Sequence, residues 1–520
     1  MRRPRPRRRA IGVVAVAALA ASLLAGCAPE ANPSWTPEPW PRVPVTVTQA
    51  PTALDPARVD SLIGQRVRND RVGIQARWMR LPGDAPLNAR LAQIVRDAIA
   101  AGSAASYTPQ VFPRGAGLGD RACVAGSTTR PASDILGDAQ LGPAGGAGTA
   151  VACDIVAAQG TFFGERLRVV SASRGQVTAD TSITLYTDTA SGEVSTADQL
   201  WTDAAPAELW ADLVMAVRRA HGALSLSAVA PPDDTALAAV RAALAQTVPG
   251  PHGTLLITIP AGFTAPELVE IGVTATTEPL AVAISPATST TLTTRFGTAL
   301  AGASGVPYAA PAPVAAGLEN VDCTLFPCVA LTYDDGPSEF TPGILDQVAG
   351  HGASVTFFAM GEKAAANAST MVRALAEGNL VENHTWNHPH LPKLTDAQVR
   401  KQITDTTAAI ASAAGRAPTV FRPPYGDTSP RVQGDAGMAA ILWDIDTFDW
   451  QGIADDVVTQ RAVDGPSPGS IVLQHDIQAN TARTAGAVYD GLADRGFTLV
   501  NIRQLFGGTL PDRGVWRRGP

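Results

Sequence analysis

The chain has 520 residues, 45% of them hydrophobic, and a formal net charge of −7. This length predicts two folded domains joined by linkers, because a single core rarely grows so large. The first 26 residues hold six arginines and no acidic residue, and removing those six positive charges from −7 leaves −13 for the rest. An acidic chain without a basic patch argues against a nucleic-acid partner.

Residues 1–26 predict an export signal peptide. Arginines precede an uncharged apolar run, residues 11–26, which is short for a membrane span. A single membrane anchor is the alternative interpretation. The end of the run, LAGC at Leu24–Cys27, resembles the bacterial lipobox. That resemblance implies that Cys27 is lipidated, so the protein would be exported and held by this lipid at the outer face of the cell membrane. Sec and Tat export both stay open.

Four cysteines follow Cys27, and an even number in an exported chain predicts two disulfides. Proximity along the chain favours Cys123–Cys153 and Cys323–Cys328, with free buried thiols as the alternative. The sequence has no CxxC pair, so it does not support a zinc ribbon or a thioredoxin-type site.

The first half of the chain predicts a tether and an accessory domain. Residues 27–57 are rich in proline, which favours an extended tether. Residues 58–300 predict a mixed α/β accessory domain without catalytic spacing. Its helical patterns fall on residues 85–100, 205–220 and 233–248, and its strand patterns on 71–81, 181–194 and 252–260.

A linker rich in Ala, Pro and Gly, residues 301–320, leads into a regular alternation of strands and helices over 321–510. The strand patterns are 328–333, 354–360, 379–384, 419–424, 439–446, 470–476 and 497–502. A helix is predicted at 394–415, with a capping box of Thr395 and Gln398. The alternation predicts an α/β fold, a distorted seven-stranded (β/α) barrel, in which chemistry lies on the loops after the strands.

Ionisable residues lie at or just beyond the ends of these strands. They are Asp334 and Asp335 for the first strand, His384 and His388 for the third, Arg422 for the fourth, Asp446 and Asp449 for the fifth, and His475 for the sixth. Two adjacent carboxylates at the end of a buried strand repel each other unless a cation lies beside them. Two histidines four residues apart suit one metal ion, and one carboxylate with two histidines leaves positions open for water and substrate.

Five segments in order resemble the motifs of the polysaccharide deacetylase family, carbohydrate esterase family 4, also called the NodB-homology domain. They are TYDDGP (332–337), HTWNH (384–388), RPPYG (422–426), DTFDW (446–450) and VLQHD (472–476). Tyr333 replaces the usual Phe and should alter packing or add a hydrogen bond. Residues 58–300 loosely resemble the small α/β module that precedes the catalytic domain in some exported bacterial deacetylases.

The resemblance implies a role for each matching residue. A divalent metal, zinc or else cobalt, would be held by Asp335, His384 and His388, and the pKa of its water would fall towards about 7. Asp334 would be the general base, paired with Arg422.

The remaining roles concern the substrate. His475 would be the general acid, oriented by Asp446. The backbone N–H of Tyr425 would stabilise the oxyanion. The acetyl methyl would enter a pocket lined by Pro424, Trp450 and Leu473.

These roles imply a metal-dependent hydrolase that removes N-acetyl groups from a cell-surface polysaccharide. Peptidoglycan N-acetylglucosamine is the first choice of substrate, because a lipid tether would place the site within reach of the cell wall. An O-acetyl esterase with the same site is one alternative. A non-catalytic glycan-binding or sensor lipoprotein is the other.

Overall fold

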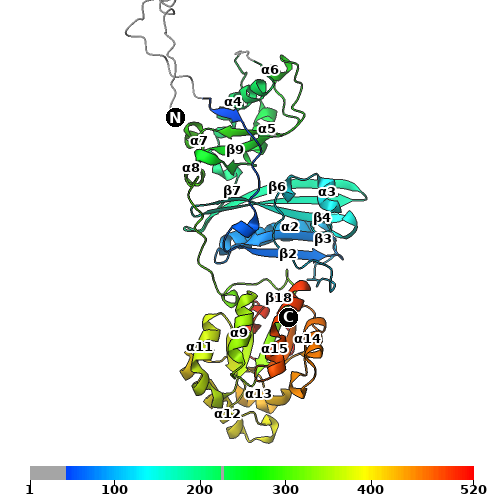
Figure 1. Cartoon of the computed structure of the whole chain (residues 1–520), viewed down its shortest axis with the longest axis vertical. Coiled ribbons are helices and arrows are strands. Elements are labelled where there is room, and N and C mark those ends of the chain that lie inside the picture. The colour runs from blue at the N-terminus through cyan, green and yellow to red at the C-terminus, as the bar shows by residue number, and fades with distance from the viewer. Residues whose placement is uncertain (1–42, 224–227) are drawn as a thin grey trace, which may run out of the picture. The chain divides into compact units, whose positions relative to one another are not determined.

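A computed structural model describes residues 43–223 and 228–520 (Figure 1). Within them, Pro44–Pro520 forms one compact unit. The predicted signal peptide, Cys27 and the predicted tether up to residue 42 lie outside the described residues. No helix in the described ranges is both long enough and apolar enough to cross a membrane.

A six-stranded sheet has the order β2-β3-β4-β5-β6-β7 and is antiparallel except for the pair β3–β4. Its strands are β2 Ile63–Asn69, β3 Ile74–Arg80, β4 Gly148–Gln159, β5 Phe162–Ser173, β6 Gln176–Asp188 and β7 Glu193–Thr196, and its helices are α2 Ala85–Gly102 and α3 Ala132–Gly137. Asp84 caps α2, because its carboxylate accepts a hydrogen bond from the Leu87 N–H at 3.0 Å. Leu87, Leu91 and Val95 then recur on one helix face and are buried in the core of this sheet.

A four-stranded antiparallel sheet has the order β1-β10-β9-β8. Its strands are β1 Val45–Val47, β8 Val248–Pro249, β9 Leu255–Ile259 and β10 Leu280–Ile284, and its helices are α4 Ala205–Ala220, α5 Asp234–Leu244, α6 Pro266–Val269, α7 Pro286–Leu292 and α8 Arg295–Gly302. Leu209 and Leu213 of α4 pack with Ile257 and Val282 in a second hydrophobic core.

These two sheets confirm all six elements that the sequence predicts between residues 71 and 260. The accessory region is mixed α/β with two sheets, and the core of the four-stranded sheet also includes Phe162 and Tyr186 of the six-stranded one. One expectation is corrected. The predicted tether does not extend to residue 57, because Val45–Val47 pairs with β10. A three-residue strand inside a proline-rich stretch has too little alternation to be recognised from sequence.

The third sheet is parallel and has the order β16-β17-β11-β12-β13-β14-β15-β19, with β18 also paired to β11. Its strands are β11 Cys328–Asp334, β12 Thr356–Ala359, β13 Leu380–Asn383, β14 Val420–Phe421, β15 Ala439–Ile441, β16 Ile445–Asp446, β17 Ser470–His475, β18 Thr498–Leu499 and β19 Val515–Trp516. Its helices are α9 Thr341–Gly350, α10 Gly361–Ala364, α11 Ala368–Ala376, α12 Asp396–Ala414, α13 Pro430–Ala436, α14 Asp455–Asp464, α15 Ala479–Asp494 and α16 Ile502–Leu505. The predicted capping box of Thr395 and Gln398 is present at the start of α12.

This parallel sheet has nine strands rather than the predicted seven. The predicted strand 439–446 is divided into β15 and β16, and β19 lies beyond the predicted end at residue 510. The C-terminal residues extend from β15 to β17, since β19 pairs with β15 and Arg518 bridges to Ser470. Arg518 also forms an ion pair with Asp444, which directly precedes the two-residue β16.

Both predicted disulfides, Cys123–Cys153 and Cys323–Cys328, are present. The second closes a short loop directly before β11. Leu325 in this loop is fully buried in the core of the six-stranded sheet, and the ring of Phe326 lies 5.6 Å from the ring of Trp78. The loop therefore fixes the start of the strand that carries the two aspartates.

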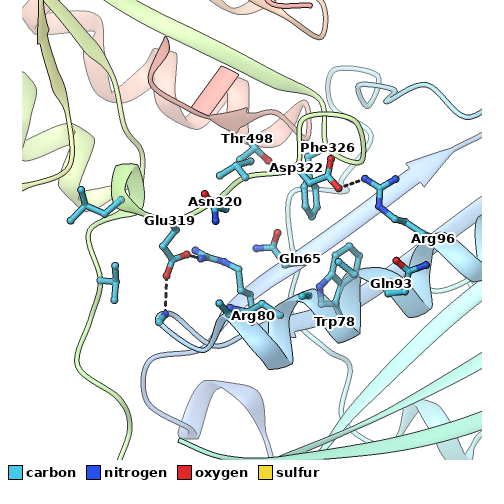
Figure 2. Close-up of a pocket in the computed structure, with 18 residues that line it drawn as sticks. Gln65, Trp78, Arg80, Gln93, Arg96, Glu319, Asn320, Asp322, Phe326 and Thr498 are labelled. Carbon is cyan, nitrogen blue, oxygen red and sulfur yellow. Dashed lines mark hydrogen bonds and ion pairs between the residues drawn. The ribbon is translucent and has the colours of Figure 1, made fainter. Parts of the chain in front are cut away.

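Figure 2 shows the surroundings of this loop. The ion pairs Arg80–Glu319 and Arg96–Asp322 connect the six-stranded sheet and α2 to the segment before β11. They flank a cavity of about 650 Å³.

Candidate metal and catalytic site

The predicted site lies at one edge of the parallel sheet. Strands β11, β13, β14 and β17 end there, because parallel strands have their C-terminal ends on the same side. Donor atoms of Asp335, His384 and His388 come within 4.8 Å of one another at this edge. The structure thus brings Asp335 together with two histidines that lie about fifty positions further along the sequence.

A tight turn after β11 carries the two aspartates. Asp334 is the last residue of β11 and is buried, while Asp335 has a left-handed backbone with φ 73°. A β-carbon on Gly336 would lie 2.0 Å from Asp476 Oδ2, so only glycine fits at this position. The same Asp476 oxygen accepts a hydrogen bond from the Thr341 hydroxyl at 2.5 Å, which ties the turn to the start of α9.

Three donor atoms face a common point. His384 Nε2 lies 3.3 Å and His388 Nε2 lies 3.5 Å from Asp335 Oδ1. Ligands bound about 2.0–2.1 Å from a tetrahedral zinc ion lie about 3.3 Å apart, so these separations fit one metal ion. Asp335 Oδ1 is buried and has no hydrogen bond of normal geometry within the described residues. The donor set therefore fits a divalent metal with a preference for nitrogen and oxygen ligands.

The protonation of these ligands suits metal binding. Burial alone would raise the pKa of Asp335, but the interaction with His384 and the nearby His388 outweighs burial and lowers it. Burial and the charge of His384 lower the pKa of His388. Both shifts favour an ionised carboxylate and a neutral imidazole, the forms that bind metals.

Two further contacts hold the ligands in place. His384 Nδ1 lies 2.8 Å from the carbonyl oxygen of Arg422, so Nδ1 carries the proton and Nε2 is left as the ligand atom. Lys363 Nζ donates a hydrogen bond to the Asp335 carbonyl at 2.7 Å. The sequence analysis did not single out Lys363, because a lysine four residues after a strand carries no distinctive signal.

Arg422 fixes the carboxylate of Asp334 beside the metal-ligand cluster. The guanidinium is fully buried and donates from Nη1 to Asp334 Oδ1 at 2.8 Å. Its other donors reach the hydroxyl of Thr332 at 2.7 Å and the carbonyls of Ile441 and Leu442 at 2.8 and 3.0 Å. All three guanidinium nitrogens are thus paired, and the Asp334 carboxylate has a fixed orientation.

His475 pairs with Asp449, so the predicted pairing with Asp446 is wrong. His475 Nδ1 lies 2.9 Å from Asp449 Oδ1, and Asp449 Oδ2 accepts the His475 backbone N–H at 2.7 Å. Asp446 instead accepts the backbone N–H of Phe448 at 2.8 Å. The left-handed backbone of Phe448, with φ 57°, lies between the two aspartates, and it is Asp449 that reaches His475.

The electrostatic environment keeps His475 protonated. Burial lowers its pKa, but the hydrogen bond and charge of Asp449 outweigh burial, with further contributions from Asp334 and Asp335, and raise the pKa to about 9. An imidazole with this pKa carries its proton at neutral pH and can donate it to a leaving group.

The residues predicted to contact substrate lie on the same loops. Pro424 is buried and Tyr425 is 59% exposed, with φ 61° at Tyr425. Leu473 is buried on β17 two residues before His475, and Trp450 is 51% exposed directly after Asp449. The hydroxyl of Tyr333 forms a buried hydrogen bond with the hydroxyl of Tyr489 at 2.8 Å, so of the two expected effects of replacing Phe the structure shows the added hydrogen bond.

Comparisons with known proteins define the class of this chain. The sequence profile of the polysaccharide deacetylase family matches residues 322–441. A chitooligosaccharide deacetylase of Sinorhizobium fredii is 33% identical over 196 residues, which cover 34% of this chain and 91% of that protein. The chain belongs to the polysaccharide deacetylase family.

Two further relatives are similar to part of the chain. The peptidoglycan-N-acetylglucosamine deacetylase PgdA of Listeria monocytogenes is 38% identical over 183 residues, 35% of this chain and 39% of that protein. The chain thus spans about two fifths of that relative's length. A solved structure of the peptidoglycan deacetylase PdaC from Bacillus subtilis is 36% identical and covers 35% of this chain and 91% of that one, with a TM-score of 0.35.

The pairing of His475 gives a testable prediction. Asp449→Asn removes the carboxylate charge that raises the pKa of His475, so this pKa should fall. If His475 must be protonated for turnover, the alkaline limb of the pH profile of kcat/KM should move to lower pH than in the wild type. Asp446→Asn is the matched control and should move the limb less. A larger shift from Asp446→Asn than from Asp449→Asn would contradict the assignment.

Proposed function

We propose that this chain removes N-acetyl groups from an N-acetylated polysaccharide of the cell surface by metal-assisted hydrolysis. The observation that carries the proposal is the division of roles between adjacent carboxylates. Asp335 lies with two imidazoles at metal-ligand spacing, and Asp334 lies against a buried arginine. Asp335 can therefore act as a metal ligand and Asp334 as a general base, because their main partners differ.

The ligands Asp335, His384 and His388 would hold a divalent ion, with zinc first and cobalt second. Such an ion would polarise the acetyl carbonyl and lower the pKa of a water molecule. Asp334 would accept the proton of the attacking water, because Arg422 fixes its carboxylate 3.7 Å from His384 Nε2. A bond forms between the water oxygen and the acetyl carbon.

The other residues serve the carbonyl oxygen and the leaving group. The Tyr425 backbone N–H would donate a hydrogen bond to the carbonyl oxygen as it gains negative charge. His475, held by Asp449, would give its proton to the amide nitrogen while the C–N bond breaks. Leu473, Pro424 and Trp450 would enclose the acetyl methyl. The products are acetate and a free amino sugar.

Exposed aromatic side chains support a glycan substrate. Trp386 is 36% exposed, Tyr425 59% and Trp450 51%, and they follow β13, β14 and β16. Exposed aromatic rings around a polar site suit the apolar faces of sugar rings. The Listeria relative is a peptidoglycan-N-acetylglucosamine deacetylase, so we take this sugar of the cell wall as the first substrate to test.

The substrate experiment uses the purified chain with purified peptidoglycan, N-acetylglucosamine oligomers and acetylxylan. Release of acetate from the first two, with mass spectrometry showing free amino groups on N-acetylglucosamine, is the expected result. Acetate release from acetylxylan alone would identify an O-acetyl esterase instead. Binding to glycan without acetate release from any substrate, in zinc-loaded protein, would identify a binding protein.

The two aspartates can be separated by substitution. Asp335→Ala removes a ligand and should abolish both bound zinc and activity. Asp334→Asn keeps the shape of the side chain but cannot accept the proton, so zinc should stay near stoichiometric while kcat falls by roughly 10²–10⁴. Metal content by elemental analysis and kcat on an N-acetylglucosamine oligomer check this. Loss of zinc from Asp334→Asn, or its retention in Asp335→Ala, would refute the division of roles.

Anchoring is a separate proposal that rests on the LAGC sequence at Leu24–Cys27. If Cys27 is lipidated, the wild-type protein should fractionate with membranes, and Cys27→Ala should move to the soluble fraction or stay as uncleaved precursor. Fractionation of cells and the mass of the N-terminal peptide measure this. Identical fractionation and N-terminal mass for both proteins would exclude the lipid anchor.

A further inference from the structure

Two loops of the site are joined to each other at two places. The metal loop, residues 384–390, follows β13, and the oxyanion loop, residues 422–427, follows β14. The inner contact is the buried one between His384 Nδ1 and the Arg422 carbonyl at 2.8 Å. The outer contact lies at the surface and involves His390, Tyr425 and Asp427. Two of these three residues lie outside the five motifs: His390 follows the HTWNH motif, and Asp427 follows the RPPYG motif.

The outer contact has a defined geometry. The rings of His390 and Tyr425 stack with centroids 4.0 Å apart and planes 14° apart. His390 Nδ1 lies 3.0 Å from Asp427 Oδ2, two residues after Tyr425. The Tyr425 ring also meets the metal ligand His388 edge-on, with centroids 4.5 Å apart. Three rings and one carboxylate thus form a continuous contact from the metal loop to the oxyanion loop.

The backbone in both loops needs such support. Tyr425 has φ 61° and ψ 7°, and His388 has φ 61°, a left-handed conformation that bulky residues rarely adopt. The Tyr425 side chain is 59% exposed, so core packing does not hold it. Its ring contacts are with the two histidines of the metal loop.

We infer that His390 is a positioning residue whose stacking keeps the Tyr425 peptide in its left-handed conformation and, through the Tyr425 ring, fixes the orientation of His388. The roles of Tyr425 and His388 in this inference rest on the proposed function. His390 itself reaches neither the acetyl carbon nor the metal donors. Its effect would pass through stacking to two residues that do.

Stacking rather than charge carries the effect. The side chains of His390 and Asp427 are 40% and 49% exposed, and an ion pair in such a position contributes little because water screens it. A flat ring over the Tyr425 ring excludes water from one whole face and restricts rotation of that side chain. A phenyl ring at position 390 should therefore replace the imidazole, although it cannot bond to Asp427.

The experiment compares His390→Ala, His390→Phe and Asp427→Asn in the full chain, with Lys393→Ala as a control for an exposed residue on the same segment. Zinc affinity is measured by competition with a chromophoric chelator, and kcat and KM on an N-acetylglucosamine oligomer. His390→Ala should lower kcat and zinc affinity by about 10–100-fold, as loss of a residue that orients a metal ligand does. KM should change little, and His390→Phe should recover most of both losses. Asp427→Asn and Lys393→Ala should stay near the wild type.

Two results would overturn the inference. Wild-type kcat and zinc affinity in His390→Ala would show that the stack positions nothing. Equal losses in His390→Ala and His390→Phe would show that stacking is not the cause. Unfolding midpoints identify a variant that is merely misfolded. If His390→Ala is such a variant, kcat and zinc affinity of His390→Phe and Asp427→Asn decide, since both should stay near the wild type. If the wild type released no acetate from any glycan, the proposed function would fail, while zinc affinity would still decide the role of His390.

Discussion

Repulsion between Asp334 and Asp335 is the constraint around which the site is arranged. Adjacent carboxylates at the end of a buried strand are stable only if each has a cationic or polarising partner. The left-handed backbone at Asp335 points its carboxylate to His384 and His388, while Asp334 stays against Arg422. Neighbours in sequence thus have different main partners, and under the proposed function this lets one bind a metal and the other accept a proton.

Arg422 connects these two groups to the strands that carry them. Its guanidinium bonds to β11 through Thr332 and Asp334 and to the end of β15 through the carbonyls of Ile441 and Leu442. Its own carbonyl lies 2.8 Å from His384 Nδ1 and so fixes the metal ligand after β13. A lysine has a single nitrogen and no planar fork, so it could not reach these four acceptors in their directions. Burial makes this pattern strict, since any donor left unpaired there would be costly.

The sequence predicted those parts of the molecule that depend on spacing and periodicity. The alternation of strands and helices predicted a parallel sheet, and the resemblance to the deacetylase motifs predicted a set of metal ligands whose donor atoms the structure brings together. Sequence spacing could not choose between Asp446 and Asp449 as the partner of His475, because the choice depends on the left-handed turn at Phe448. It also could not separate two sheets within residues 58–300, since apolar periodicity shows that a residue is buried but not in which core.

Non-glycine residues with a positive φ are concentrated in the loops of the site. In the described part of the chain, eight non-glycine residues have a positive φ, and five of them lie in the loops of the site, namely Asp335, Thr385, His388, Tyr425 and Phe448. Such conformations persist only where the surrounding contacts over-determine them. Here each loop makes at least one polar or ring contact with another loop. These contacts stabilise the strained backbone conformations. The motifs therefore encode more than ligands: they carry the residues that adopt these turns, and residues within and just beyond the motifs hold the turns in place.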